Sequence, residues 1–310
     1  MRSKGSEQQG FWRKGMARWF VGAGLALAVL LVVLVGMVFA VSESRINRTY
    51  ALEPAALIIA PDASMVARGM AIATYRGCRD CHGDNLAGRL VADAMPVMRL
   101  ASPNITPGGV TRNYTDVDWA RTIRHGVRPD GTPVRFMPSF EYTALSHADM
   151  AALLAYVKSV PAVAEAAVPF AVGPLGRVLH LAGELPLLPV ELIDHNAEPA
   201  EPTPGPTADY GSYLATACIG CHGPGLSGGP IPGVPPDWPP SANLTRHVTG
   251  LADWRFEDFR TALREGKRPD GSAIRGEYMP WRLIAQSSDD DIRALWEFIG
   301  TMPPRTAGLR

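Results

Sequence analysis

The stretch Cys78-Arg79-Asp80-Cys81-His82 decides the fold of this 310-residue chain, and it recurs 140 positions later as Cys218-Ile219-Gly220-Cys221-His222. Together the two stretches contain all four cysteines of the sequence. In the pattern C-x-x-C-H, the two thiols are spaced to form thioethers with haem vinyl groups, and the adjacent imidazole binds the iron. The pattern therefore predicts two covalently attached c-type haems. The predicted attachment points are Cys78, Cys81, Cys218 and Cys221, and the predicted proximal iron ligands are His82 and His222.

Paired cysteines have two other uses in proteins. A C-x-x-C pair also forms redox-active disulfides or half of a zinc site. Neither use requires a histidine directly after the second cysteine, and here that histidine follows both pairs. The sequence therefore favours haem attachment and leaves zinc or dithiol chemistry as the alternative.

The similarity between the two halves extends beyond the cysteines. Four elements recur at offsets of 139 to 142 positions. They are Asn104-Ile105-Thr106 with Asn243-Leu244-Thr245, 124–131 with 264–271, Met137-Pro138 with Met279-Pro280, and 149–156 with 291–298. The repeat predicts two copies of one domain, at 62–162 and 207–310, joined by a connector at 163–206.

Each copy has the same expected helical plan. A short helix leads into the cysteine motif, a middle helix follows, and a final helix begins at a serine N-cap. The expected helices are 64–75, 116–125 and one starting near Ser146, then 209–217, 256–265 and one starting near Ser288. Gly69 and Gly211 are expected to permit a close helix crossing. No alternating strand pattern stands out, so the predicted fold class is all-α.

A haem iron takes either a sixth ligand or an open site, and methionine or histidine is the usual protein ligand. Met137 and Met279 each precede a proline and recur 55 and 57 residues after the haem histidine, so we predict them as distal ligands. Met95 and Met98 have no counterpart in the second copy and are expected to pack. His125 is replaced by Glu265 in the repeat. The remaining histidines are expected to make ordinary hydrogen bonds; they are His147, His180, His195 and His247.

Two further repeated elements each fit two roles. Arg128 and Arg268 lie in Arg-Pro-Asp-Gly turns, where they either neutralise haem propionates or flank a solvated turn. Asn104 and Asn243 begin N-x-Thr triplets, which formally match a glycosylation acceptor. A loop role near the haem is the alternative for these asparagines.

The N-terminal region predicts a membrane anchor. Residues 19–41 form an uncharged, apolar run of 23 residues, and a membrane-spanning helix needs about 20. Residues 1–18 carry five basic residues and one acidic residue, so the positive-inside rule makes them a cytoplasmic basic tail. This predicts a single-pass protein of the bacterial cytoplasmic (inner) membrane, with the haem domains in the periplasm. A cleaved signal peptide, with a site near 38–40, is the alternative.

Composition excludes several classes of protein. The chain is 46% hydrophobic and 19% charged, which is ordinary for a globular protein. It has 30 basic and 30 acidic residues, and this balance excludes a strongly basic nucleic-acid binder. No collagen or coiled-coil period is present.

The connector has a composition of its own. Residues 172–189 are apolar but are interrupted by proline, glycine and two charged residues, so a second membrane span is not expected. We expect this stretch to pack across both haem domains as a short helix and an extended strap, and an exposed apolar patch on it as a partner surface is the alternative. Residues 198–206 read as a proline-rich flexible linker.

The haem motifs, the Asn-Ile-Thr-Pro and Arg-Pro-Asp-Gly elements and the Met-Pro loops resemble those of membrane-bound class I type multihaem cytochromes c. Over residues 62–310 the chain is most similar to the cytochrome subunits of periplasmic alcohol, aldehyde and gluconate dehydrogenases. Those subunits typically carry three haem domains and often a C-terminal anchor, whereas this chain is expected to have two and an N-terminal anchor. The resemblance implies two tandem class I type cytochrome c domains after one N-terminal transmembrane helix.

These inferences predict an electron carrier rather than an enzyme, with no catalytic residue. The expected partners are the lipid bilayer and a redox protein such as a periplasmic dehydrogenase, another cytochrome or an oxidase. Electrons would pass from a dehydrogenase to the membrane respiratory chain. The alternatives are a tethered shuttle to a terminal oxidase, a dihaem peroxidase and a haem-based sensor.

Overall fold

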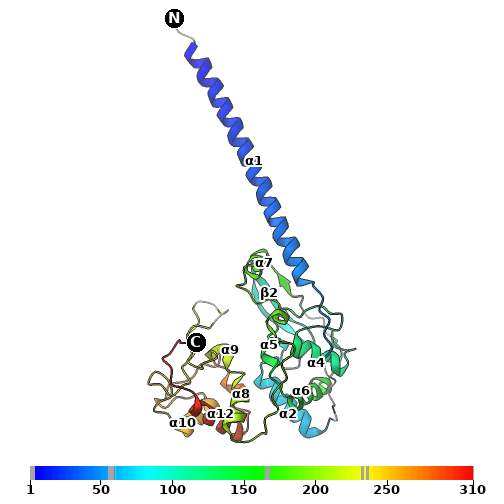
Figure 1. Ribbon diagram of the computed structural model, residues 1–310, viewed down its shortest axis with the longest axis vertical. Coiled ribbons are helices and arrows are strands. Elements are labelled where there is room, and N and C mark those ends of the chain that lie inside the picture. Colours follow the sequence, from blue (N-terminus) through cyan, green and yellow to red (C-terminus); the bar gives the residue numbers. More distant parts are fainter. Residues whose placement is uncertain are drawn as a thin grey trace.

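The computed structural model describes residues 4–54, 59, 61–164, 168–231, 234 and 237–309. For residues 4–18 it describes the backbone alone, so the basic side chains of the predicted cytoplasmic tail lie outside the described residues. The described chain forms one long helix and two helical units, and Figure 1 shows the helix projecting away from both units.

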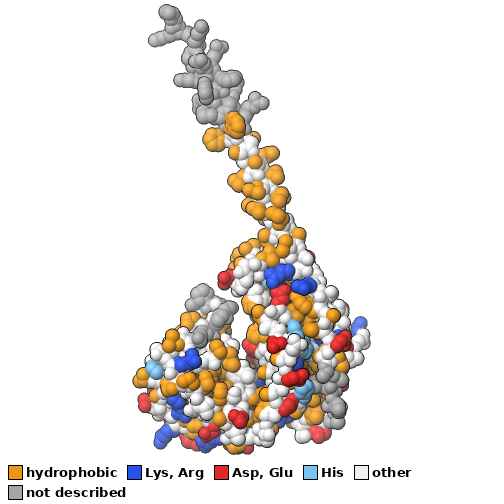
Figure 2. Space-filling view, viewed as in Figure 1, with side chains coloured by type: hydrophobic (Ala, Val, Ile, Leu, Met, Phe, Trp, Pro, Cys, Tyr) orange, Lys and Arg blue, Asp and Glu red, His pale blue; other side chains and the backbone are white. Residues whose placement is uncertain are grey.

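The long helix is α1, Lys4–Ile46. Within its segment Trp19–Ile46, an apolar stretch of 18 residues has a mean hydropathy of 3.0, and no residue of that stretch is buried. Figure 2 shows its hydrophobic side chains exposed along the stalk. By length and composition this helix is able to cross a membrane.

The first helical unit consists of α2 to α6, which surround one apolar core. The helices are α2 (Ala63–Tyr75), α3 (Cys78–His82), α4 (Asp116–His125), α5 (Ser139–Tyr142) and α6 (His147–Ser159). The core is built from buried residues of α2, α4 and α6 together with Leu86 and Leu145. Ser146 caps α6 by accepting from the Asp149 backbone amide at 3.0 Å, which confirms the N-cap expected from the sequence.

The second helical unit repeats this plan with α8 to α12. The helices are α8 (Ala208–Ala215), α9 (Ile219–His222), α10 (Phe256–Glu265), α11 (Trp281–Ile284) and α12 (Asp289–Thr301). Ser288 caps α12 with a capping box, again as expected. A separate apolar core includes Phe259, Ile292 and Trp296.

In both units the first helix crosses the last one at a glycine. A Cβ added at Gly69 would lie 1.9 Å from the Ala152 carbonyl oxygen, and one added at Gly211 would lie 1.9 Å from that of Ala294. Real side chains do not tolerate such distances, so only glycine permits this crossing. The expectation of a close helix crossing at both positions is confirmed.

A small sheet in the first unit is absent from the sequence-based expectation. Strands β1 (Arg89–Ala94) and β2 (Met98–Ser102) form an antiparallel hairpin, and β3 (Ala171–Val172) pairs with β2. Five of the six residues of β1 are exposed, so the strand has no buried face to impose an alternating pattern. The described chain is nevertheless mostly helical, with two tandem units after the apolar helix, as predicted.

The connector packs on the first unit and on α1. It contains β3, helix α7 (Pro174–Leu181) and a 3-10 turn, η1 (Pro189–Leu192). Its buried residues Leu187, Leu188 and Val190 form a cluster with Val127 and with Ile46 at the end of α1. The expected short helix is present, but the described contacts of α7 and η1 attach them to the first unit and to the base of the long helix rather than across both haem domains as expected, because the connector's apolar side chains pack with Val127 and Ile46.

Candidate functional site

The two cysteine motifs adopt the same local structure. Each forms one short helical turn that ends at a glycine with positive φ, Gly83 (83°) or Gly223 (75°). The backbone then turns back, so the amides of Gly88 and Gly228 donate to the carbonyls of His82 (2.8 Å) and His222 (2.9 Å). The sequence repeat is therefore a repeat of backbone geometry at the predicted haem sites.

The motif histidines are held in the tautomer that a metal ligand needs. The Nδ1 of His82 lies 2.9 Å from the Pro103 carbonyl oxygen, and that of His222 lies 2.8 Å from the Ala242 carbonyl oxygen. A carbonyl oxygen only accepts, so Nδ1 carries the proton and Nε2 carries the lone pair. Burial lowers the pKa of His82 despite the hydrogen bond to Pro103, which keeps the imidazole neutral. Both histidines thus fit the role of a haem-iron ligand.

The cysteines fit thioether attachment better than metal thiolate chemistry. All four are free of disulfide bonds, and Cys81 and Cys221 are exposed. Burial raises the pKa of Cys78 to about 12 and that of Cys218 to about 11, so both remain thiols at neutral pH. Among the described residues no group of three or more His, Cys, Asp or Glu side chains is placed to hold a metal ion. This donor set gives no support to the zinc alternative.

The predicted distal methionines lie in matching turns. Pro138 (φ −77°, ψ 59°) and Pro280 (φ −76°, ψ 53°) have nearly the same backbone conformation and open the short helices α5 and α11. Met137 packs on the same apolar cluster as Cys78, and Met279 packs on the same cluster as Cys218. The fold therefore brings each methionine to the core that also contains its unit's first motif cysteine.

The other candidate distal ligands, Met95, Met98 and Met302, do not lie at matching positions in the two units. Met95 is 50% exposed at the hairpin turn, and Met98 is buried in β2. Met302 packs on the second core with Met279, although it follows the end of α12. Only the Met-Pro turns occupy equivalent places in both units.

Four other histidines make hydrogen bonds outside the haem motifs, some of them between residues far apart in the sequence. His147 lies 2.8 Å from a Glu201 carboxylate oxygen, and His247 lies 2.9 Å from the Thr249 hydroxyl. His195 donates to the Val190 carbonyl, and its Nδ1 lies 3.1 Å from that of His125. No local sequence pattern indicates this His125–His195 pair, because the two residues are 70 positions apart.

The N-x-Thr triplets are buried structural clamps. The Asn104 amide donates to the Val163 carbonyl (2.7 Å), and its Oδ1 accepts from the Thr106 amide (2.9 Å). Asn243 does the same with the Arg305 carbonyl (2.7 Å) and the Thr245 amide (2.9 Å). Each triplet thus ties the loop after the haem motif to the segment that follows the last helix. Burial of both asparagines agrees with the loop role rather than with glycosylation.

The arginines of the two Arg-Pro-Asp-Gly turns fold back onto those turns. Arg128 donates to the Thr132 hydroxyl (3.3 Å) and the Pro133 carbonyl, and Arg268 donates to the Ser272 hydroxyl (3.3 Å) and the Ala273 carbonyl (3.1 Å). Arg128 also lines a hollow of about 730 Å³ together with Pro103. The carbonyl of Pro103 is the group that orients His82, the predicted proximal ligand. That hollow includes two more arginines, Arg112 and Arg135. None of the predicted haem-binding residues Cys78, Cys81, His82 and Met137 lines this hollow, so the propionate role of Arg128 stays a prediction.

The residues that precede the two motifs meet at the boundary between the units. The Tyr75 hydroxyl donates to the Leu214 carbonyl (2.6 Å) and reaches the Cys218 thiol, while Arg76 donates to the Thr216 hydroxyl (2.8 Å). These positions lie only two or three residues before Cys78, and two to four before Cys218. The two predicted haem sites are therefore joined by direct contacts between their leading segments.

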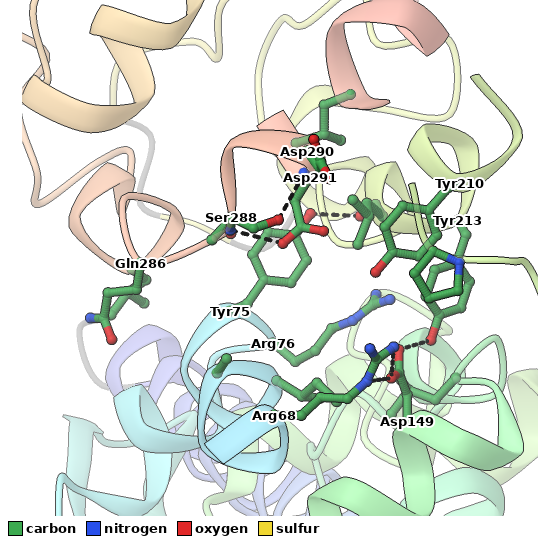
Figure 3. A pocket seen from close by; sticks show the side chains of 18 of the residues that line it. Arg68, Tyr75, Arg76, Asp149, Tyr210, Tyr213, Gln286, Ser288, Asp290 and Asp291 are labelled. Carbon is green, nitrogen blue, oxygen red and sulfur yellow. Dashed lines mark hydrogen bonds and ion pairs between the residues drawn. The ribbon is translucent and has the colours of Figure 1, made fainter. Parts of the chain in front are cut away.

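A polar network around the buried Asp149 carboxylate lies at the same boundary. The Tyr213 hydroxyl donates to Asp149 (2.5 Å), and Arg68 donates to the other oxygen of that carboxylate (2.5 Å). Figure 3 shows these side chains beside Tyr75 and Arg76 in a cleft of about 410 Å³ between the units. Burial raises the pKa of Tyr213 to about 12, with the Asp149 charge as the next cause, so the phenol stays a donor. The network therefore links α2 and α6 of the first unit to α8 of the second.

Comparison with known proteins agrees with this repeated structure. The family model described as Cytochrome c matches residues 66–161 and 208–303, one copy for each helical unit. Each match includes the cysteine motif, the N-x-Thr clamp and the Met-Pro turn of its unit.

Curated relatives are cytochrome subunits of dehydrogenases. The chain is 30% identical over 276 residues to the alcohol dehydrogenase (quinone) cytochrome c subunit of Gluconacetobacter polyoxogenes, covering 78% of this chain and 57% of the relative. It is 35% identical over 117 residues to the fructose dehydrogenase cytochrome subunit of Gluconobacter japonicus, covering 34% and 24%. It is 34% identical over 95 residues to the gluconate 2-dehydrogenase cytochrome c subunit of Pantoea cypripedii, covering 28% and 21%. At best, then, the chain spans little more than half the length of these three relatives.

Proposed function

The chain belongs to the cytochrome c family, and from this premise we propose that it is a membrane-anchored dihaem electron carrier. One covalent haem is assigned to each domain, at 62–162 and 207–310. Cys78 and Cys81 attach the first, and Cys218 and Cys221 the second. His82 and His222 are the proximal ligands, and Met137 and Met279 are the distal ligands.

The observation that carries this proposal is the matched pair of His and Met positions. In each unit a backbone carbonyl fixes the tautomer of the motif histidine. A Met-Pro turn, which has the same conformation in both units, places the methionine in the apolar core that also contains that unit's first motif cysteine. When bound, haem iron supplies one-electron redox chemistry, and the protein supplies attachment, ligation and burial. Two protein ligands on each iron leave no position for a substrate. This favours electron transfer over catalysis.

The boundary between the units supports transfer within the chain. Tyr75 and Arg76 connect the segment before the first motif to the segment before the second, by hydrogen bonds of 2.6 and 2.8 Å. Electrons accepted at one site would therefore have a short, rigid route to the other. The direction of flow depends on the two potentials.

The relatives support a dehydrogenase as the electron donor. Their names describe cytochrome subunits of alcohol, fructose and gluconate dehydrogenases. In our proposal α1 anchors the chain in the bacterial cytoplasmic membrane, the haem domains lie in the periplasm, and electrons pass from a dehydrogenase to the membrane respiratory chain. A tethered shuttle to a terminal oxidase is the second candidate, because a single anchor leaves the haem domains accessible to either partner.

Changing the distal methionines tests the ligand assignment. In Met137→His and Met279→His, haem content should be retained, while the midpoint potential of one haem falls by on the order of 0.1–0.3 V, since Met ligation raises the potential and axial ligands span ~0.8 V. Redox titration with optical detection measures both haems separately. Met95→His is the matched control, because Met95 is half exposed and has no equivalent in the second unit. Unchanged potentials in both distal variants would contradict the assignment.

Partner capture tests the proposed donor. Gentle solubilisation of native membranes, purification of this chain and mass spectrometry should recover a dehydrogenase catalytic subunit, and its substrate should then reduce the haems. Recovery of an oxidase, or of no stable partner, would favour the shuttle. Carbon monoxide binding to the native ferrous protein would instead reveal an open iron and support a peroxidase or a sensor.

A further inference from the structure

Helix α7 has one face seated on the first unit and one face bare. Gly176 and His180 are buried, and a Cβ added at Gly176 would lie 2.1 Å from the Val97 carbonyl oxygen, so this face rests directly on the β1–β2 hairpin. On the other side, Leu175 and Val178 are 45% and 47% exposed. The neighbouring hairpin turn adds Met95, which is 50% exposed. We call Met95, Leu175 and Val178 the α7 patch.

Nothing polar interrupts the exposed side of α7. Its sequence, Pro174–Leu181, contains two polar side chains, Arg177 and His180. His180 is buried, and Arg177 points toward α1. An exposed helix face made only of apolar side chains is unusual for a surface in contact with water and marks an interaction site.

Arg177 determines which residues of α1 lie beside α7. Its guanidinium pairs with Glu43 at 2.7 Å, donates to the Ser42 hydroxyl at 2.8 Å and lies 4.7 Å from the centroid of the Phe39 ring. The helix therefore sits beside residues 39–43. Figure 1 shows α7 at the top of the first unit, next to the lower end of α1.

Residues 39–43 of α1 lie at the end of the uncharged apolar run. At about 1.5 Å per residue, the uncharged stretch 19–41 spans about 35 Å, slightly more than a hydrocarbon core of about 30 Å. Phe39 then lies at the boundary of the hydrocarbon, and Glu43 lies among the headgroups. The side chains of α7, which lies beside Phe39 and Glu43, are therefore at the boundary between the hydrocarbon and the headgroups.

We propose that the α7 patch is an interfacial membrane contact, which inserts into the boundary between headgroups and acyl chains where α1 leaves the bilayer. The proposal rests on the proposed anchor and adds a second contact to it. A single helix would leave the domains free to swivel, whereas a second contact beside it sets the orientation of the first unit on the membrane. In Figure 2 hydrophobic side chains continue from the stalk onto the top of this unit.

Spin-label accessibility in the full-length dihaem protein tests the contact. All four native cysteines are assigned to thioethers, so an added cysteine is the single free thiol. Nitroxide labels are placed in Leu175→Cys and Val178→Cys, with Val35→Cys in the apolar run and Val248→Cys, 78% exposed on the second unit, as controls. Each protein is reconstituted in vesicles of phosphatidylethanolamine and phosphatidylglycerol. Collision rates with oxygen, which partitions into lipid, and with a water-soluble nickel chelate are then compared.

The labels at 175 and 178 should show an oxygen-to-nickel collision ratio severalfold above that at 248, with the haem spectrum unchanged. A ratio equal to that at 248, with a high ratio at 35, would overturn the contact and leave the anchor intact. Shielding of 175 and 178 from both reagents would also overturn it, because the patch would then face protein. A low ratio at 35 would reject the anchor itself, and the contact with it.

Discussion

The two helical units share their haem-site elements and differ in what surrounds them. Both have a glycine helix crossing, a histidine held by a carbonyl, an N-x-Thr clamp and a Met-Pro turn. Among the residues that the structure describes, the β-hairpin occurs in the first unit alone, and the connector adds a third strand to it and packs on α1. The recurring parts are those that a haem requires, and the differing parts attach the first unit to the anchor.

The difference arises in a segment of nearly constant length. From the motif histidine to the clamp asparagine there are 22 positions in the first unit and 21 in the second. In the first unit this segment forms β1 and β2. In the second it contains six prolines between 230 and 240, and the described residues there form one isolated bridge, Gly229–Ser241. Proline lacks the amide that a strand ladder needs, so a proline-rich sequence of this kind disfavours a hairpin.

The largest expected effect comes from removing one pair of thiols. Cys78→Ala with Cys81→Ala, and separately Cys218→Ala with Cys221→Ala, should each halve the haem content per chain, because each unit has its own core. Pyridine haemochrome absorbance per mole of protein measures this. Loss of both haems from either variant would show that the units do not bind haem independently.

Next in size is the helix crossing. Gly69→Ala and Gly211→Ala should each lower the free energy of unfolding by roughly 3 kcal/mol or more, since the added carbon collides with a backbone carbonyl. Gly300→Ala, also in a helix but with nothing within 4 Å of the new carbon, should stabilise by up to about 1 kcal/mol. Thermal unfolding followed by circular dichroism compares the three. If Gly69→Ala and Gly211→Ala lower the free energy of unfolding by clearly different amounts, the helix crossings of the two units are not equivalent.

The clamps are expected to contribute less. Asn104→Ala and Asn243→Ala should each cost about 1–3 kcal/mol, because each leaves the buried amide of Thr106 or Thr245 without its acceptor. Asn196→Ala, at an exposed position of the connector, is the control and should change stability little. Denaturant unfolding of the four proteins gives the values. A cost confined to one unit would mean that only one clamp supports its fold.

The smallest expected effect is a pH dependence of folding stability that occurs in the first unit and not in the second. Burial, then the proximity of His195 and Arg124, lowers the pKa of His125 to about 4 from an ordinary 6.5, and the second unit has Glu265 at this position. Between these values the unfolded chain binds a proton that the folded chain does not, so stability falls as the pH drops from 6.5 toward 4. In His125→Gln this part of the acid loss should disappear. Parallel stability profiles of variant and parent would argue against the shift.

Local elements were predictable because their signals are local. The middle helices were expected at 116–125 and 256–265, and α4 and α10 occupy those residues. Serine caps, a following apolar period and a terminating glycine or proline act within a few residues of one another. The hairpin was missed because β1 is exposed on both faces and gives no alternation. The His125–His195 pair was missed because it joins residues 70 positions apart.

Residue types and their spacing were sufficient to predict the haem chemistry and the anchor, from paired thiols with an adjacent histidine, repeated once, and an apolar segment long enough to span a membrane. These are properties of residue type and spacing, which the chain carries before it folds. Only the tertiary structure decided that Tyr75 meets Leu214, that Pro103 and Ala242 orient the two histidines, and that Arg177 fixes α7 beside α1. Such contacts join distant segments, and packing of the whole chain, rather than any local pattern, selects which of them form.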